Sequence, residues 1–206
     1  MHVPKHFRVT ERDALFGLIN NHPLGVLVTT IDGRLEATHV PCMLDTGHGD
    51  LGRLRFHLAR LNPAAAALAD AGELLVMYTG AQAYVSPDWY QSPNMVPTWN
   101  YAAVHVYGHA SELDDATLCI LLEDLSAAEE SKLDKPAWTM DKVETGHYAR
   151  MRRAIVGFEL AITEVQGKWK LGQNRSRDDR RGVAAALGNS DADRERAMAE
   201  LVNAVD

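Results

Sequence analysis

The chain has 206 residues, of which 46% are hydrophobic and 24% charged, and its formal net charge is −7. This composition predicts a single folded domain over residues 1–206 and argues against a nonspecific nucleic-acid binder. No run approaches the roughly 18 apolar residues of a membrane span, and the first residues lack the apolar segment of a secretion signal. We therefore expect a cytoplasmic protein that makes no membrane contact.

The first predicted element is a helix that begins after Thr10 and ends near Pro23. A threonine followed by Glu-Arg-Asp is typical of a capped first turn, because a hydroxyl can accept a backbone hydrogen bond and acidic side chains favour a helix N-terminus. The apolar residues that follow recur at helical spacing. Proline cannot continue a helix, so Pro23 should end it.

A hairpin is predicted next. The runs 24–30 and 34–41 are β-branched or alternating, and they are joined through Asp32-Gly33, the most common chemistry for a tight turn between strands. Alternation along the second strand places Thr38 and His39 on opposite faces, so the same environment cannot surround both side chains.

Residues 53–58 predict a strand with one apolar and one polar face. The polar face carries Arg53, Arg55 and His57 and should point to solvent or to a ligand. The strand continues into Asn62-Pro63, which suits the start of a helix over the alanine-rich residues 64–69.

This predicted junction has two interpretations. Free amides at the helix start, together with the nearby Arg60, would suit a phosphate group. The alternative is an ordinary strand-to-helix connection with a solvated arginine.

Residues 84–109 form an aromatic belt that holds four of the six tyrosines and two of the four tryptophans, beside two histidines and three prolines. Short strands are predicted at 73–79 and 83–85, followed by a Pro-bounded loop and a strand at 101–109. Such a gathering of rigid rings predicts the wall of a ligand site for planar molecules. The alternative interpretation is aromatic core.

The C-terminal half is predicted to contain an amphipathic helix at 114–130, an irregular segment with a short helix at 138–151, and a strand at 154–165. The run GKWKLGQNRS at 167–176 reads as a loop that could serve an anion and a planar ring together, since it combines cations, amides and an indole. A helical tail over about 177–206 should begin at a cap provided by Ser176. Many short strands with peripheral helices favour a small barrel in an α+β domain.

Other chemistry has little support in the sequence. The nine histidines show no HExxH or comparable pairing, so we expect no metal site. No GxSxG or Walker motif occurs, so a nucleotide phosphate would need a site other than a P-loop. Cys42 and Cys119 have no metal-ligand spacing, and a structural disulfide is not expected.

Seven motifs in order resemble the PaiB family, the FMN-binding negative transcriptional regulators: HVPKHFR, LEATHVP, LRFHLARLNP, AYVSPDWY, VPTWNYAAVHVYG, IVGFEL and GKWKLGQNRS. The resemblance covers residues 1–188. It implies a mainly β, α+β fold, the split β-barrel of pyridoxamine-phosphate oxidases and flavin reductases, with peripheral helices. It also implies a homodimer with FMN sites at the subunit interface.

Carried over by motif, the resemblance also implies which residues bind the cofactor. No catalytic residue is assigned. The expected FMN-binding residues are Thr38, His39, His57, Leu58, Ala59, Arg60, Asn62, Thr98, Trp99, Asn100, Tyr101, Lys170, Gln173 and Asn174.

The resemblance leaves several functions open. The first is an FMN-dependent oxidoreductase, in which the flavin performs the redox chemistry and the protein supplies position and electrostatics. The second is a redox-linked negative transcriptional regulator, although direct DNA binding is disfavoured because the basic segment 175–181 is short and contains two aspartates. The alternatives are a haem-binding or haem-degrading split barrel, or a flavin-free module for another metabolite.

Overall fold

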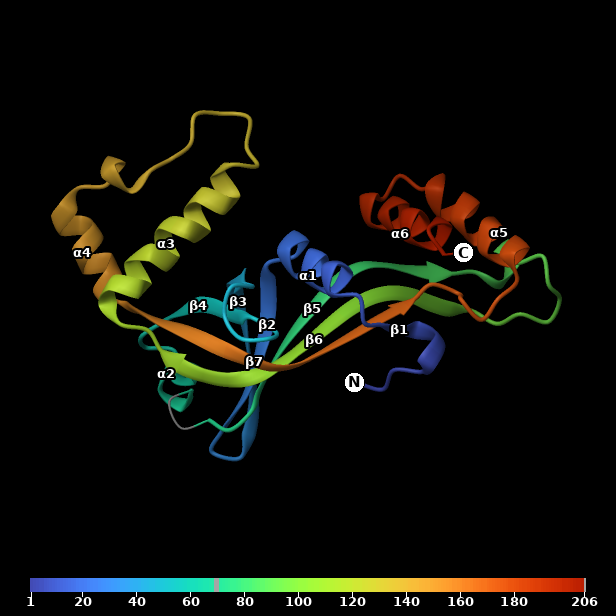
Figure 1. Ribbon diagram of the computed structural model, residues 1–206. Coiled ribbons are helices and arrows are strands. Elements are labelled where there is room, and N and C mark those ends of the chain that lie inside the picture. Colours follow the sequence, from blue (N-terminus) through green and yellow to red (C-terminus); the bar gives the residue numbers. More distant parts are fainter. Residues whose placement is uncertain (69–70, 206) are drawn as a thin grey trace. The chain divides into compact units, whose positions relative to one another are not determined.

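The computed structural model describes residues 1–68 and 71–205, so the last predicted position of the alanine-rich helix, Ala69, lies outside the described residues (Figure 1). The strands form a seven-stranded sheet of order β1-β7-β4-β3-β2-β5-β6, and β6 also pairs with β7. This extra pairing closes the ring of six strands from β7 round to β6, which makes the sheet a barrel. The fold is thus α+β and mainly β, as predicted.

The strands are β1 Arg8–Val9, β2 Leu24–Ile31, β3 Arg34–Asp45, β4 Arg53–Ala59, β5 Leu74–Val85, β6 Thr98–Glu112 and β7 Ile155–Lys170. The α-helices are α1 Arg12–Asn21, α2 Pro63–Ala67, α3 Asp115–Glu130, α4 Thr145–Arg153, α5 Arg177–Gly188 and α6 Asp193–Asn203. Short 3-10 helices are η1 Lys5–Phe7, η2 Pro87–Trp89 and η3 Met140–Lys142. No helix in the described ranges is both long and apolar enough to span a bilayer.

The described chain forms two compact units. The first comprises Met1–His22, Tyr78–His105 and the residues from Gln166 to the C-terminus, and the second comprises Pro23–Met77 and Val106–Val165. The boundaries fall inside β5, β6 and β7, so these three strands contribute to both units.

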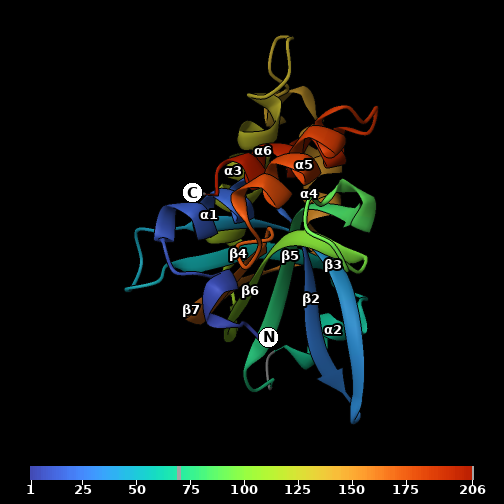
Figure 2. The same cartoon turned by 90° about the vertical axis from the view of Figure 1, so that its right-hand side faces the viewer.

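In the second unit, the predicted hairpin is confirmed. β2 and β3 pair antiparallel with Ile31 opposite Arg34, and the turn residues Asp32 and Gly33 have φ angles of 51° and 77°. Both angles lie in the left-handed region that a type I′ turn requires. Figure 2 shows this long hairpin, with α2 beside it.

The core of this unit is apolar, as the strand pattern predicted. Leu54 and Phe56 are completely buried, and the ring of Phe56 stacks on that of Phe158 with centroids 5.8 Å apart.

The predicted exposure of the polar face of β4 is wrong for its two arginines. Arg55 is only 9% exposed, and its guanidinium donates to the Asp124 carboxylate of α3 at 3.0 Å. Arg53 lies between the carboxylates of Asp45 and Glu159. Helix α3 packs against β4 and covers Arg55, whereas Arg53 is paired with carboxylates of the neighbouring strands β3 and β7.

Helices α3 and α4 lie side by side (Figure 1). Arg152 of α4 joins them, since its guanidinium donates to the Asp115 carboxylate at 2.9 Å and to the Cys119 thiol at 2.6 Å. Asp114 caps α3 by accepting from the backbone N–H of Thr117 at 2.7 Å, which confirms the predicted start of this helix.

Four strands are longer than predicted by several residues. Strand β3 continues to Asp45, and β6 begins at Thr98 and ends at Glu112. Residues 74–85 form one strand, not two, and its buried positions change parity between Tyr78 and Ala83. Gly80 lies at this change, and a glycine between apolar runs resembles a loop in the sequence. Strand β7 continues to Lys170, so the first part of GKWKLGQNRS is strand and the turn begins only at Gly172, whose φ is 83°.

In the first unit, α5 and α6 pack together over an apolar cluster that includes Val183, Leu187 and Met198. Ser176 caps α5, with its hydroxyl accepting from the backbone N–H of Asp179 at 3.1 Å, as predicted. At α1 the predicted cap is wrong. The cap position is Glu11, without a side-chain bond to the helix, and Thr10 only donates its own N–H to the Glu11 carboxylate.

Candidate functional site

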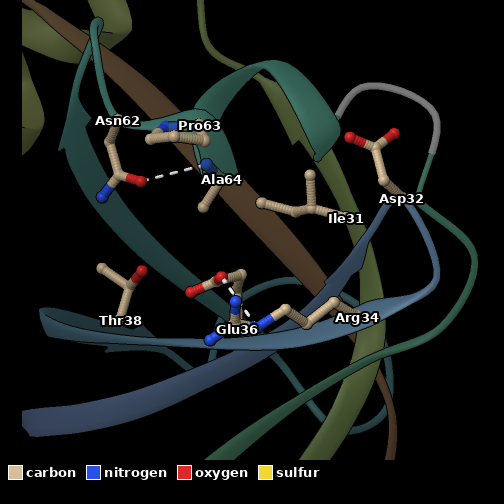
Figure 3. A pocket seen from close by; sticks show the side chains of 8 residues that line it. All are labelled: Ile31, Asp32, Arg34, Glu36, Thr38, Asn62, Pro63 and Ala64. Carbon is tan, nitrogen blue, oxygen red and sulfur yellow. Dashed lines mark hydrogen bonds and ion pairs between the residues drawn. The ribbon is translucent and has the colours of Figure 1, made fainter.

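A cavity of about 390 Å³ lies in the second unit where the β2–β3 hairpin faces the start of α2 (Figure 3). Its lining residues come from the hairpin and from the junction that precedes and begins the helix. They are Ile31, Asp32, Arg34, Glu36, Thr38, Asn62, Pro63 and Ala64. The cavity thus brings together Thr38 and Asn62, two of the predicted cofactor-binding residues that lie far apart in the sequence.

Strand alternation explains the hairpin side of this cavity. Arg34, Glu36 and Thr38 lie two residues apart on β3 and therefore share one face, while His39 lies on the other face and is exposed. The predicted separation of Thr38 and His39 is confirmed. The predicted site did not include Arg34 and Glu36, although the same alternation places both on the face of Thr38.

Asn62 lines the cavity on the side of α2 and caps that helix. Its Oδ1 accepts from the backbone N–H of Ala64 at 3.0 Å, which confirms the predicted cap and leaves the Nδ2 group of the amide as a donor. The backbone N–H of Ala65 is bonded to the Asn62 carbonyl oxygen. The helix start therefore offers the Asn62 side chain to a ligand, while these first-turn amides are already used.

The cavity offers three donor side chains, beside the two carboxylates of Asp32 and Glu36. The Thr38 hydroxyl makes no hydrogen bond within the described residues, and the Arg34 guanidinium is only loosely paired with the Glu36 carboxylate, 3.7 Å away. A hydroxyl, an amide N–H and a guanidinium are the groups that bind phosphate and sugar oxygens.

Arg60 lies just before α2. Its Nε and Nη2 donate to the carbonyl oxygens of Arg153 and Ile155 at 3.2 and 2.9 Å. These two bonds hold the exposed guanidinium at the start of β7, and Nη1 makes no hydrogen bond among the described residues. Of its predicted companions, Ala59 is exposed at the end of β4, whereas Leu58 is 4% exposed and belongs to the core.

His57 is half-buried, and its Nδ1 is buried without a hydrogen-bond partner among the described residues. It pairs with Gly157 of β7 and shares a face with it, where a Cβ on Gly157 would meet Leu118 and Leu113. Burial disfavours the charged imidazolium and lowers the pKa of His57. The side chain is therefore neutral at pH 7.

The remaining predicted residues lie in the first unit, where Lys170 at the end of β7 is bonded to the start of β6. Its ammonium donates to the Trp99 carbonyl oxygen at 2.8 Å and to the Thr98 hydroxyl. Burial, with the charges of Lys168 and Arg175, lowers the pKa of Lys170. Trp99 is 51% exposed, and its ring meets that of Tyr84 edge-on with centroids 6.2 Å apart.

The other four predicted residues of this unit have different environments. Tyr101 lies under the Lys168 ammonium, 5.2 Å from the ring centroid, and Asn100 is buried. Both ends of the Gln173 amide are used inside its own turn, since Oε1 accepts from Leu171 N and Nε2 donates to Trp169 O. Asn174 is exposed.

Metal chemistry finds no support in the part of the chain that the structure describes, where no group of three or more His, Cys, Asp or Glu side chains could hold an ion.

Comparisons with known proteins identify the family. Residues 1–164 match the family described as "Putative FMN-binding domain". The chain is 34% identical over 203 residues to "Protease synthase and sporulation protein PAI 2" of Bacillus subtilis, covering 98% of this chain and 96% of that protein.

Solved structures support the fold. A protein described as the FAD and heme binding protein of Mycobacterium smegmatis aligns with a TM-score of 0.60 at 19% identity, covering 86% of this chain and 79% of that one. The flavocytochrome Anf3 of Azotobacter vinelandii aligns with a TM-score of 0.62 at 16% identity, covering 86% and 77%. At these identities the likeness establishes the fold alone.

The closed barrel and its donor-lined cavity define a split-barrel flavoprotein. More narrowly, the chain belongs to the PaiB-like FMN-binding family, and its cofactor is FMN. The cavity fits part of this group, because about 300–1,000 Å³ is usual for small-ligand sites and its free donors match phosphate and ribityl oxygens.

Proposed function

We propose that this protein is an FMN-dependent oxidoreductase, in which the cavity between the β2–β3 hairpin and α2 holds the phosphate and ribityl end of the cofactor. The observation that carries the proposal is the convergence of the Thr38 hydroxyl and the Asn62 amide in one cavity. When bound, FMN would supply the hydride and electron transfer. Thr38, Asn62 and Arg34 would bind and orient it.

The exposed ring pair of Tyr84 and Trp99, with Lys170 beside it, supports a role for the first unit toward the planar part of the ligand. Aromatic faces stack on planar heterocycles, and a nearby cation favours electron-rich or anionic ones. In this proposal the protein is a homodimer, and each FMN site is completed at the subunit interface.

A large apolar surface in the second unit supports this dimer. The outer face of the β2–β3–β5 sheet carries Leu24 and Leu35, 59% and 72% exposed, beside the half-buried Val26, Val28 and Met77. Exposed apolar faces of this kind usually mark interaction surfaces.

The oxidoreductase is favoured over a regulator that binds DNA directly because two of the three arginines of α5 are already engaged. Arg180 donates to the carbonyl oxygens of Arg175 and Val205, and Arg181 pairs loosely with Asp178. Asp179 is buried. Because Asp178 is exposed and only Arg177 is unbonded among the described residues, α5 offers few free cations to phosphates.

The test is a spectral titration of the purified protein with FMN, riboflavin and haemin, followed by assays of NADH and NADPH oxidation. We expect tight binding of FMN, weaker binding of riboflavin and flavin-dependent turnover. Equal affinity for FMN and riboflavin would contradict the phosphate site. A Soret band with haemin alone would move the function to haem, and bound FMN without turnover would favour the regulator.

Thr38→Val provides the residue-level test, because valine keeps the shape and removes only the hydroxyl. We expect FMN binding to weaken by about 1 kcal/mol, the usual contribution of a hydrogen bond. Thr79→Val, at an exposed position of β5, is the matched control and should leave FMN affinity unchanged. Fluorescence quenching of FMN measures both, and equal affinities would exclude contact between Thr38 and the cofactor.

A further inference from the structure

A second cavity, of about 370 Å³, lies within the first unit between α1 and α6, against β5, β6 and β7. We call it the α1–α6 groove. Much of its surface comes from residues with small side chains, namely Ala14, Gly17, Gly80, Ala81, Ala102 and Ala197. Trp169, Leu18 and Leu201 supply larger apolar groups. None of the predicted FMN-binding residues lines it.

Gly17 leaves open space in the groove. It lies in the middle of α1, where glycine destabilises a helix relative to alanine. Neither packing nor backbone conformation requires it, since a Cβ at this position would meet no atom within 4 Å and its φ is not positive. The missing side chain instead keeps the groove open.

The groove carries negative charge. Asp13 of α1 and Glu200 of α6 line it, and neither side chain makes an ion pair or hydrogen bond in the described part of the chain. No lysine or arginine is among the described lining residues. Strand alternation in β7 explains this, because Lys168 and Lys170 lie on the face opposite Trp169.

The two remaining polar lining residues lie at the end of α1. Asn21 is the last residue of the helix and His22 is its C-cap, with Nε2 3.5 Å from the position that a Cβ on Gly80 would occupy. This end offers an amide and an imidazole, so the formal charge of the groove comes from the two carboxylates.

We propose that the α1–α6 groove binds a small organic cation, an ammonium group on a short apolar body. The apolar body would fill the space over the alanine and glycine surface, against the Trp169 indole. The ammonium would pair with Asp13 and Glu200 and be favoured further by the indole face. A carboxylate of the same shape would be repelled. This site is independent of the flavin cavity.

The experiment compares two probes of similar size, phenethylammonium and 3-phenylpropionate, on the full chain in the presence of FMN. Binding is followed by the NMR signal of the Trp169 indole N–H, assigned with Trp169→Phe. We expect the cation to shift this signal in a saturable way and to bind at least about tenfold more tightly than the anion. Equal binding of the two probes, or no shift, would overturn the proposal.

Variants locate the site. Gly17→Leu should abolish the shift, because its Cβ meets no atom within 4 Å and the rest of the side chain would occupy the groove. Asp13→Asn and Glu200→Gln, both exposed and expected to fold, should each weaken phenethylammonium binding by about 3- to 10-fold. Asp191→Asn, an exposed change outside the groove, is the control. Unchanged binding in all three groove variants, or a response only to a basic amphipathic peptide, would contradict a small-cation site.

Discussion

At the residue scale, Asp179 shows how one buried carboxylate fixes the aromatic loop. It is 2% exposed and accepts hydrogen bonds from the backbone N–H groups of Gln91 and Ser92 and from the Ser92 hydroxyl, all within 2.9 Å. Burial raises the pKa of Asp179, but the bonds from Ser92, Ser176 and Gln91 outweigh it and lower the pKa to about 2. The loop between β5 and β6 is thereby tied to α5.

Replacing this carboxylate tests how much these hydrogen bonds stabilise the protein. Asp179→Ala should destabilise the protein at pH 7 by about 1.5–3 kcal/mol, the usual contribution of hydrogen bonds to a charged group. Because the folded pKa is depressed, this contribution is present above the unfolded pKa near 4 and is lost as the pH falls toward 2. Urea unfolding at pH 7 and pH 2.5 should show the difference from wild type shrinking in acid. A constant difference would mean that lost packing, not charge, is responsible.

His57 should make stability depend on pH near neutrality, at higher pH than Asp179 does. Its lowered pKa means that the unfolded state binds the proton more readily, so its stabilising contribution is complete above about pH 6.5 and declines below that value. Wild type should therefore lose more stability between pH 7.5 and pH 5 than His57→Gln does. Urea midpoints at the two pH values measure this, and the other histidines cancel in the comparison. Equal losses would show that the pKa of His57 is the same in the folded and unfolded protein.

At the element scale, the sequence predicted the turns and helix caps that depend on neighbouring residues. The Asp32-Gly33 turn and the caps at Asn62 and Ser176 were predicted because each depends on residues within a few positions. The covering of Arg55 by α3 could not be predicted, since its partner Asp124 lies 69 positions away. The cavity needed the same kind of distant pairing, between Thr38 and Asn62.

The turn itself is a testable element. Gly33→Ala should destabilise the protein by about 1 kcal/mol, because φ is 77° there and a Cβ is disfavoured in the left-handed region. Asp32→Asn should have almost no effect, since asparagine tolerates that region well. Thermal unfolding compares the two. If the hairpin shapes the cofactor cavity, Gly33→Ala should also weaken FMN binding, and an unchanged affinity would separate the turn from the site.

At the scale of the whole molecule, the predicted cofactor residues divide between the two units. Thr38 and Asn62 belong to one, and Trp99 and Lys170 belong to the other. Such a division is expected if a second copy of the chain completes each site, although the single-domain and homodimer expectations remain predictions. The exposed apolar face of β2, β3 and β5 offers a surface where two copies could meet.

Leu35→Asp tests the dimer directly. Leu35 is the most exposed large apolar residue of that face, at 72%, so a charge there would oppose a self-complementary interface without disturbing the core. We expect a monomer by light scattering that has lost FMN. Ile120→Asp, 53% exposed on α3, adds the same charge elsewhere and should leave a dimer with bound FMN. Because a site shared between subunits cannot survive their separation, a Leu35→Asp monomer that retains FMN would place the whole site within one chain.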